Sequence, residues 1–423
     1  MQKVRGTQDW FEKESFYFRS MEEQFFKKAL AYGFGEIKTP LFEHSEVFHR
    51  TLGESSDVIA KETYTFNDRS NESLTLRPEG TAGIARSFIS EGLAQKIPLK
   101  FYYCGPMFRY ERPQKGRFRQ FHQMGIEVLG IDSPSMDIEC LQLGYDLLKI
   151  IGVEQKCVLK LNTLGDPESR AAYKEKLVSY YSQFKQDLSK DSQTRLVKNP
   201  LRILDSKDEK DIEINQMAPK LLESLNESSK KYFDTLISLL EKVNLAYQID
   251  NSLVRGLDYY GHTVFEFVTQ ELGAQGTVLA GGRYDGLISL MGGPKTPGVG
   301  WAAGVERLID LANKELLSEQ RTLISLIAAD ETGEPEVLKL AARIRNFATH
   351  TFSTHIKLTT EIIYGGNVGK KMKKAASKNS DFALVIGSTE IENKILSVKN
   401  MKTGESFQIP FELDSLMKVL GSN

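Results

Sequence analysis

The sequence has few cysteines, no long apolar run and almost no net charge. Its three cysteines, Cys104, Cys140 and Cys157, are widely spaced, and neither a CxxC nor an HExxH motif occurs. This usage favours reduced thiols over a disulfide framework, and it predicts no metal site built from side chains. The apolar runs are far shorter than the roughly 18 residues that a membrane span needs, so no membrane partner is expected.

The first residues, MQKVRGTQDWFEKES, have no apolar core and no small-residue cleavage site. They therefore fit neither a secretory signal nor an arginine-rich transit peptide, and a cytoplasmic protein is expected. The 55 lysines and arginines against 56 acidic residues give a net charge of −1. A chain so balanced is not coated with positive charge, so any RNA partner must bind at local basic patches.

A chain of 423 residues exceeds a single hydrophobic core, and two to four domains of roughly 100–200 residues are expected. Residues 1–166 contain an amphipathic helix over 11–33 and a strand-rich stretch over 99–130. Residues 167–236 have helical spacing and few strand signals, which indicates a helical insertion. Residues 237–320 are again strand-rich, so the flanking parts are expected to form one sheet interrupted by the insertion.

The last part of the chain, residues 323–423, has a different pattern. Strand-like and helix-like segments alternate there, with helices expected near 334–350 and 368–379. Such alternation predicts a small α/β domain with a largely parallel sheet. The segment near 311–322 is expected to be a linker.

The most informative stretch is FRYERPQKGRFRQFHQ, residues 108–123, which places five cations around one acid. Pro113 and Gly116 favour a turn, so a β-hairpin with a basic loop is predicted. Side chains alternate along a strand, which predicts one face shared by Arg117, Arg119, Phe121, Gln123 and Glu127 and an opposite face that includes Phe118.

Guanidinium groups beside a flat ring suit a nucleotide, because arginine pairs with phosphate and a ring can stack on a base. Charge runs are also common on solvated, salt-bridged sheet faces, and this stretch alone does not decide between the two interpretations. His122 is expected to be a packed, hydrogen-bonded residue and not a catalyst.

Two further stretches favour the nucleotide. In GVGWAAGVERL, residues 298–308, a glycine-rich segment precedes a helix that carries Glu306 and Arg307. In LRPEGTAG, residues 76–83, a turn precedes a helix, although an acid near a helix N-terminus also occurs for purely structural reasons.

With these stretches in place, the chain resembles a class II aminoacyl-tRNA synthetase, and within that class the histidyl-tRNA synthetase family of bacterial type. KTPLFE around Pro40 is similar to the first class motif, FRYERPQKGRFRQF to the second and GVGWAAGVERL to the third. LVRGLDYYGHTVFEF and LAGGRYDGL are similar to two segments peculiar to the histidine enzymes. The motifs cover essentially the whole chain.

The resemblance implies an α+β fold: an antiparallel-sheet catalytic core, a helical insertion and a C-terminal anticodon-binding α/β domain. It implies a homodimer through the region around Pro40. The implied reaction joins the histidine carboxylate to the α-phosphorus of ATP, releases pyrophosphate and then passes histidine to the 3′ end of histidine tRNA. Mg²⁺ is implied only as the counterion of ATP, held mainly through its phosphates.

The resemblance also assigns roles at the ATP end of the site. It places Arg109 on the α-phosphate and Arg307 on the γ-phosphate of a bent ATP. Arg255 would lie near the α-phosphate and the histidine carboxylate as an electrostatic catalyst, and with Arg109 it completes the catalytic pair. The family's contacts to the adenine edge, the phosphates and the lower face of the base match Glu111, Arg117 and Phe121.

Histidine needs acceptors for its ammonium group and partners for both ring nitrogens. The residues that match this task, besides Arg255, are Glu79, Thr81, Gln123, Glu127, Tyr260 and Tyr284. For tRNA, the loop residues Arg112, Gln114 and Lys115 resemble the part that meets the acceptor end. The helix VGKKMKKAASK carries Lys370, Lys374 and Lys378 on one face, which suits either RNA backbone or an exposed solubilising surface.

Two other functions are compatible with parts of the pattern. A non-catalytic relative of these enzymes, the regulatory subunit of an ATP phosphoribosyltransferase, keeps the core fold, but the segment around Arg255 and the C-terminal domain argue against it. A stand-alone RNA-binding protein does not explain ATP-type and histidine-type residues on one sheet face. Ala280 and Trp301 depart from the family pattern, and neither touches a charged group of the implied reaction.

Overall fold

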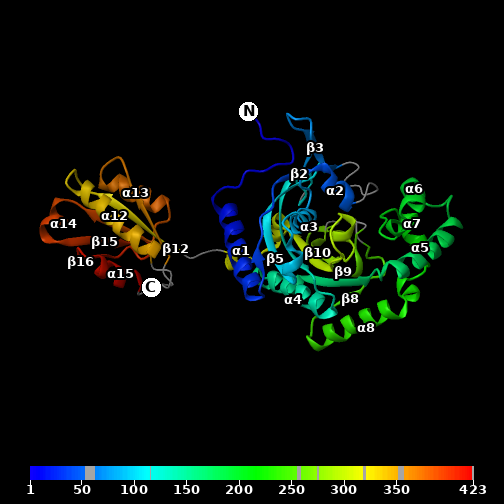
Figure 1. Ribbon diagram of the computed structural model, residues 1–423. Coiled ribbons are helices and arrows are strands. Elements are labelled where there is room, and N and C mark those ends of the chain that lie inside the picture. The colour runs from blue at the N-terminus through cyan, green and yellow to red at the C-terminus, as the bar shows by residue number, and fades with distance from the viewer. Residues whose placement is uncertain are drawn as a thin grey trace. The chain divides into compact units, whose positions relative to one another are not determined.

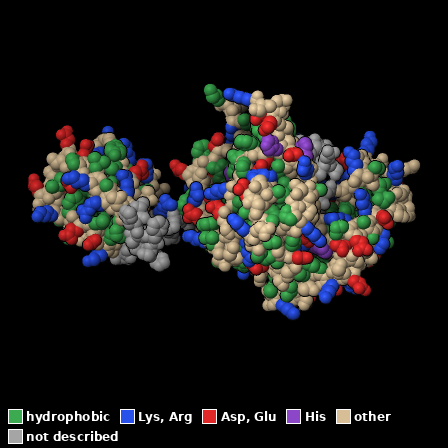
Figure 2. Space-filling model, viewed as in Figure 1, with side chains coloured by type: hydrophobic (Ala, Val, Ile, Leu, Met, Phe, Trp, Pro, Cys, Tyr) green, Lys and Arg blue, Asp and Glu red, His purple; other side chains and the backbone are tan. Residues whose placement is uncertain are grey.

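The computed structural model describes residues 1–52, 62–114, 116–254, 259–273, 276–317, 321–350 and 357–421. The chain forms two compact units, Met1–Ser318 and Glu319–Asn423. None of the helices within these described ranges is long and apolar enough to cross a membrane. On the face that Figure 2 shows, basic and acidic side chains are interspersed, as the balanced composition predicts.

The first unit is built on one eight-stranded sheet (Figure 1). The six strands from β5 to β7 pair antiparallel, and a short parallel strand closes each edge. This confirms that the strand-rich stretches on either side of the insertion belong to one sheet. The strand order is β1 (Gly35–Glu36), β5 (Leu99–Phe108), β6 (Gln120–Leu129), β11 (Gly298–Gly304), β10 (Thr277–Arg283), β9 (Gly261–Thr269), β7 (Cys157–Thr163) and β8 (Gln248–Ile249).

The main core lies between one face of this sheet and a layer of helices. Helix α1 buries Met21, Phe25 and Ala29, four residues apart, which is the spacing of a single helix face. Ser133 caps the N-terminus of α4 with its side-chain oxygen. Trp301 is buried in this core, and its ring nitrogen donates a hydrogen bond to the Cys140 carbonyl (2.8 Å). The helices of this layer are α1 (Glu12–Ala31), α4 (Pro134–Ile150), α8 (Glu227–Lys242), α10 (Val305–Leu311) and α11 (Lys314–Leu317).

The segment near 311–322 is therefore not simply a linker, which corrects the prediction. Helix α11 packs against α1, and Leu317 is fully buried. Leu317 packs in the same hydrophobic core as the buried residues of α1, so this part of the segment belongs to the first unit.

The other face of the sheet carries a second core and the site. It packs against α3 (Thr81–Ser90), α2 (Ser45–Leu52), α9 (Leu287–Leu290) and the 3₁₀ turn η2 (Leu93–Lys96). A three-stranded sheet is formed by the chain segments on either side of α2, with the order β2 (Phe42–His44), β4 (Ser73–Leu76) and β3 (Tyr64–Asn67).

The segment expected to be a helical insertion forms helices, as predicted. Asp166, Ser189, Asp208 and Asn226 each cap the N-terminus of one of them with a side-chain oxygen. Helix α8 continues to Lys242 and packs on α4, so by its contacts it belongs to the main core. The other elements of this segment are α5 (Pro167–Ser182), α6 (Lys190–Lys198), η4 (Pro200–Ile203), α7 (Glu209–Asn215) and η5 (Leu221–Ser224), and the 3₁₀ turn η3 (Glu154–Lys156) lies before it, between α4 and β7.

The second unit has a five-stranded sheet in the order β13-β12-β14-β15-β16. Only the pairs that β12 makes are parallel, and β14–β15 and β15–β16 are antiparallel, so the predicted largely parallel sheet is in fact mixed. After β14 the connections are too short for a parallel crossover. The elements are β12 (Arg321–Ala328), α12 (Gly333–His350), β13 (Lys357–Ile362), α13 (Val368–Ser377), β14 (Phe382–Ile386), α14 (Ser388–Asn393), β15 (Ile395–Asn400), β16 (Ser406–Pro410) and α15 (Leu413–Gly421).

Candidate active site

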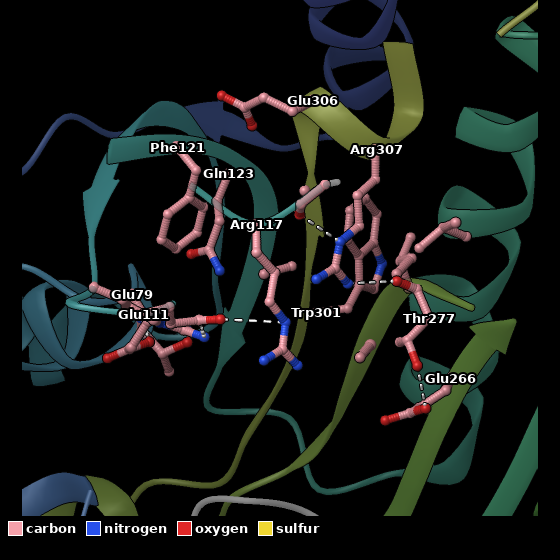
Figure 3. A pocket seen from close by; sticks show the side chains of 18 of the residues that line it. Glu79, Glu111, Arg117, Phe121, Gln123, Glu266, Thr277, Trp301, Glu306 and Arg307 are labelled. Carbon is pink, nitrogen blue, oxygen red and sulfur yellow. Dashed lines mark hydrogen bonds and ion pairs between the residues drawn. The ribbon is translucent and has the colours of Figure 1, made fainter. Parts of the chain in front are cut away.

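A cleft of about 410 Å³ opens on the second face of the large sheet (Figure 3). It is lined by strands β6, β9, β10 and β11, by the loop between β5 and β6, and by the first residues of α3 and α10. These segments are far apart in the chain. The antiparallel strand order brings them together.

Basic side chains gather at one end of the cleft. Arg109 Nε donates to the Pro78 carbonyl (2.9 Å), and its guanidinium carbon lies 5.3 Å from the centre of the Phe121 ring. Glu111 lies between two arginines, 3.8 Å from Arg109 Nη1 and 3.2 Å from Arg117 Nε. The acid keeps the two guanidinium groups side by side, while Phe121 supplies a flat apolar surface next to them.

Arg307 reaches the same end of the cleft from the first turn of α10. Its Nε donates to the Gly116 carbonyl (3.1 Å) and its Nη1 to the Thr277 carbonyl (2.8 Å). Burial lowers the pKa of Arg307, and the positive charges of Arg117 and Arg109 lower it further. The three arginines are therefore close enough to repel one another, which is what a site for a polyanion requires.

Glu306 points away from its neighbour Arg307 (Figure 3). Its carboxylate accepts from the backbone N–H of His122 through both oxygens and lies 3.0 Å from His122 Nδ1. The His122 ring packs edge-on against Trp10 and Phe18. His122 is thus a packed, hydrogen-bonded residue, as predicted. The contact between Glu306 and His122 connects α10 to β6.

The other end of the cleft is built from buried carboxyl and hydroxyl groups. Glu79 caps α3, accepting from the backbone N–H groups of Thr81 (2.6 Å) and Ala82 (2.8 Å). Glu127 accepts from the Thr81 hydroxyl (2.6 Å) and from the Tyr284 hydroxyl. Burial raises the pKa of Glu79, and it raises the pKa of Glu127 to about 8, although the hydroxyl donors oppose the shift.

The neighbouring strand leaves room for Glu127 because it has a glycine there. A β-carbon at Gly300 would lie 2.0 Å from Glu127 Oε2 and 2.3 Å from the Ile126 carbonyl oxygen, so a larger residue would displace the strand or the carboxylate. Gln123 projects from the same face of β6, and its Oε1 is buried with no hydrogen-bond partner within the described ranges. Tyr260 also lines this end.

Eleven of the expected substrate-contacting residues lie in the described part of the chain. Nine of them line the cleft, and Glu127 and Tyr284 are buried beside it. Arg255 and Lys115 lie outside the described residues, so their predicted roles stay predictions. Arg112 and Gln114 are exposed in the loop between β5 and β6.

The predicted face of the second hairpin strand is wrong in one part. Arg119 does not line the cleft, since its guanidinium stacks 3.9 Å from the Tyr110 ring and its backbone N–H donates to Gly6, whereas Phe118 does line it. Strand β6 begins only at Gln120. The preceding residues form an irregular loop, so the strict alternation of a strand does not extend to them.

The lysines of the second unit are less free than the sequence suggests. Lys374 Nζ donates to the Tyr364 carbonyl (2.7 Å), and Lys378 pairs with Glu361 (2.5 Å) just beyond the end of α13. Helix α13 ends at Ser377, two residues earlier than predicted. Lys370 is exposed on its first turn.

Sequence reasoning missed several residues of the cleft. Tyr259 and Glu266 both line it, and the Thr277 hydroxyl donates to Glu266 (2.8 Å). The doubled tyrosine at 259–260 offered a signal for the first, whereas no pattern marks an acid within β9. Among the described residues, no group of three or more histidine, cysteine, aspartate or glutamate side chains could hold a metal ion.

An antiparallel sheet that holds three arginines over one end of a cleft, with motif segments on β6 and α10, defines a class II aminoacyl-tRNA synthetase. The family model for histidyl-tRNA synthetase matches residues 6–308, and the anticodon-binding domain model matches residues 325–422. The chain belongs to the histidyl-tRNA synthetase family.

Individual relatives agree over nearly the full length. A protein of Rhodospirillum rubrum named histidine–tRNA ligase is 52% identical over 96% of this chain and 95% of its own. The crystal structure of apo histidyl-tRNA synthetase from S. aureus, 34% identical, superimposes with a TM-score of 0.80 over 99% of both chains. A Bacillus halodurans structure titled ATP phosphoribosyltransferase regulatory subunit/histidyl-tRNA synthetase shares the fold, with 20% identity and a TM-score of 0.64 over 91% of this chain and 97% of that one.

Proposed function

We propose that this chain is a histidine–tRNA ligase, which activates histidine with ATP and then transfers it to histidine tRNA. One observation carries the proposal: a single cleft has three converging arginines at one end and buried carboxyl and hydroxyl groups at the other. The first end suits a triphosphate and the second suits a small polar side chain with two nitrogens.

The first chemical step needs no general base, because the histidine carboxylate is already ionised. The obstacle is repulsion between this carboxylate and the negative charge of ATP, which cations in a water-poor cleft reduce. Arg109 would hold the α-phosphate, Arg307 the γ-phosphate, and Arg117 with Glu111 the phosphates and the adenine edge. Phe121 would lie beneath the base, and Arg255 would stabilise the transition state.

Histidine would bind at the opposite end. Glu79 offers negative charge to its ammonium group, with Thr81 and Gln123 as neighbouring polar partners. The imidazole would contact Glu127, Tyr260 and Tyr284. The hydroxyl groups of Thr81 and Tyr284 donate to the Glu127 carboxylate and fix its orientation. A site that leaves buried polar groups unpaired when the wrong side chain enters discriminates strongly without an editing step.

Mg²⁺ would enter as the counterion of ATP and neutralise phosphate charge. The cleft is lined by the carboxylates of Glu79, Glu111, Glu266 and Glu306, which could contact waters of that ion. Glu266, which accepts a hydrogen bond from the Thr277 hydroxyl, would be one acid able to hold a water of that ion near Arg307.

For tRNA, Arg112 and Gln114, which are exposed, would meet the acceptor end beside the cleft, together with Lys115 of the same loop. The second unit, which matches an anticodon-binding model, would bind the anticodon arm. Lys370 is the best candidate there for contact with phosphate, and Lys374 and Lys378 would have to exchange their present partners for it.

We propose that the protein is cytoplasmic. We also propose that it forms a homodimer through the region around Pro40. Leu41 and Phe42 are adjacent in the chain and 43% and 52% exposed, so a partner chain at this surface would cover two neighbouring apolar side chains. Arg77 joins this region to the cleft, since it donates to the Thr39 carbonyl (3.0 Å) and to the Pro106 carbonyl (2.9 Å) close to Arg109. Dimerisation would thereby help to order the arginine end of the cleft.

Histidine-dependent ATP–pyrophosphate exchange by the purified chain tests the proposal. Exchange with histidine and not with the other amino acids is expected, followed by charging of histidine tRNA. A regulatory subunit of ATP phosphoribosyltransferase would give no exchange with any amino acid, and that result would overturn the proposal.

A further inference from the structure

Glu306 and Arg307 are neighbours in the first turn of α10, and their side chains point in different directions (Figure 3). Phe121 and His122 are neighbours on β6. Side chains alternate along a strand, so Phe121 projects into the cleft and His122 to the opposite side, where it meets Glu306. The contact between Glu306 and His122 therefore joins the two chain positions directly beside Arg307 and Phe121.

The Glu306 carboxylate extends the pairing of β6 beyond the end of β11. The ladder between these strands ends where Gly304 lies opposite Gln123, and α10 begins at the next residue, Val305. The backbone N–H of His122, the adjacent residue of β6, donates to the side chain of Glu306, whose two oxygens each lie 3.0 Å from the nitrogen. A side chain thus takes the place of a strand partner at this position.

The partner of Glu306 is itself held in place. His122 Nδ1 lies 3.0 Å from Glu306 Oε1, and because a carboxylate only accepts hydrogen bonds, the ring nitrogen is the donor. The ring packs edge-on against Trp10 and Phe18, with ring centres 5.8 Å and 5.1 Å away. Only 6% of the Glu306 side chain is exposed, so water competes little for these hydrogen bonds.

The N-terminus of α10 depends on this contact for its position against β6. The helix is seven residues long, and its N-cap residue is a glycine, which has no side chain to cap it. The two hydrogen bonds of Arg307 go to Gly116 in the β5–β6 loop and to Thr277 in β10, so they orient the guanidinium without setting its distance from Phe121. The Glu306 contact does set this distance, because it binds the turn that carries Arg307 to the residue after Phe121.

This distance matters for a ligand that occupies both places at once. In the proposed function, ATP lies with its base on Phe121 and its γ-phosphate at Arg307. A ligand bound at one end gains the second contact only if the separation of the two groups fits its length, and a misplacement of about 1 Å can cost about 100-fold in rate. Binding of a ligand that reaches only one end does not depend on the separation.

We propose that Glu306 is a positioning residue for ATP: through His122 it fixes the separation between Arg307 and Phe121 at the length that a bound ATP requires. This inference rests on the proposed ligase function, and it assigns to that reaction a residue that acts through its neighbours.

Two conservative variants separate the reach of Glu306 from its charge. Glu306→Gln keeps the length of the side chain, and its amide oxygen can replace Oε1, the atom that accepts from both nitrogens of His122. Glu306→Asp keeps the charge but is one methylene too short to keep both contacts. Glu306→Asp is expected to raise the Kd for ATP about 10-fold, the equivalent of one hydrogen bond to a charged group, whereas Glu306→Gln is expected to keep the wild-type value.

Binding of partial ligands distinguishes positioning from local damage. AMP would reach Phe121 and Arg109 but not Arg307, and pyrophosphate would reach Arg307 but not Phe121. Equilibrium dialysis with labelled ATP, AMP and pyrophosphate is therefore expected to show that Glu306→Asp weakens the binding of ATP and leaves the Kd values of the two shorter ligands unchanged. Retained binding of AMP also shows that the variant is folded.

Asp310→Ala is the matched control, because it removes an exposed carboxylate one turn further along α10 and is expected to leave all three Kd values unchanged. The inference would be overturned by an unchanged Kd for ATP in Glu306→Asp, by an equal loss of AMP or pyrophosphate binding there, or by an equal effect of Asp310→Ala. A loss of ATP affinity in Glu306→Gln that matches or exceeds that in Glu306→Asp would also overturn it. These measurements need no turnover, so absence of histidine-dependent exchange in the wild type would instead overturn the proposed function.

Discussion

Glu127→Gln should change how the stability of the first unit depends on pH. Glu127 is 1% exposed, and burial raises its pKa from 4.5 to about 8 in the folded protein. Between these values the folded state keeps a proton that the unfolded state has lost. The free energy of unfolding of the wild type therefore falls as pH rises, by up to about 1.4 kcal/mol per pH unit from this group.

Glutamine has nearly the same shape and carries no titrating proton, so the variant lacks this contribution. The unfolding free energy of Glu127→Gln minus that of the wild type should rise by roughly 2 to 3 kcal/mol between pH 5.5 and pH 7.5. Other titrating groups largely cancel in the difference, because both proteins contain them.

Urea unfolding followed by tryptophan fluorescence measures this difference in the right part of the chain. The only two tryptophans, Trp10 and Trp301, both lie in the first unit, so the signal does not mix in the second unit. A difference that stays constant from pH 5.5 to pH 7.5 would refute the reasoning, since it would mean that Glu127 is ionised in the folded, ligand-free protein.

Four further changes test other parts of the site. Arg255→Ala should lower the rate of pyrophosphate exchange about 100-fold or more while ATP still binds, as measured by equilibrium binding beside the exchange assay; near-normal exchange would remove its catalytic role. Arg307→Ala should raise the KM for ATP much more than that for histidine, and equal increases would contradict its assignment to phosphate. Replacing Lys370 and Lys374 by alanine should flatten the salt dependence of tRNA binding in filter-binding titrations, and an unchanged slope would exclude them from the interface. Phe42→Asp should shift the chain toward monomer in analytical ultracentrifugation and lower exchange with it; an unaltered oligomeric state would place the interface elsewhere.

Much of the site could be predicted from the sequence because local pattern and chain order decide it. The alternation along β6 correctly groups Phe121, Gln123 and Glu127, since from Gln120 onward the strand is regular. The same rule fails for Arg119 and Phe118, which lie in an irregular loop where hydrogen bonds to Gly6 and stacking on Tyr110 decide the orientation. Periodicity carries no information about such a loop.

Contacts between distant segments could not be predicted in this way. Arg283 is fully buried, and its Nη2 lies 2.6 Å from Asp137 Oδ1, a partner 146 residues earlier. Nothing local to either residue indicates the pair. The carbonyl partners of Arg307 are equally hidden, because backbone groups bear no residue-specific signal.

These carbonyl partners make the surroundings of Arg307 differ in charge from those of Arg109 and Arg117. Arg109 and Arg117 share the carboxylate of Glu111, which offsets part of their charge, whereas the two hydrogen bonds of Arg307 go to uncharged backbone oxygens. These two backbone hydrogen bonds hold the Arg307 guanidinium in place before any nucleotide arrives. If Arg307 holds the γ-phosphate as proposed, ADP would contact only the partly neutralised pair of Arg109 and Arg117, and it would bind more weakly than ATP.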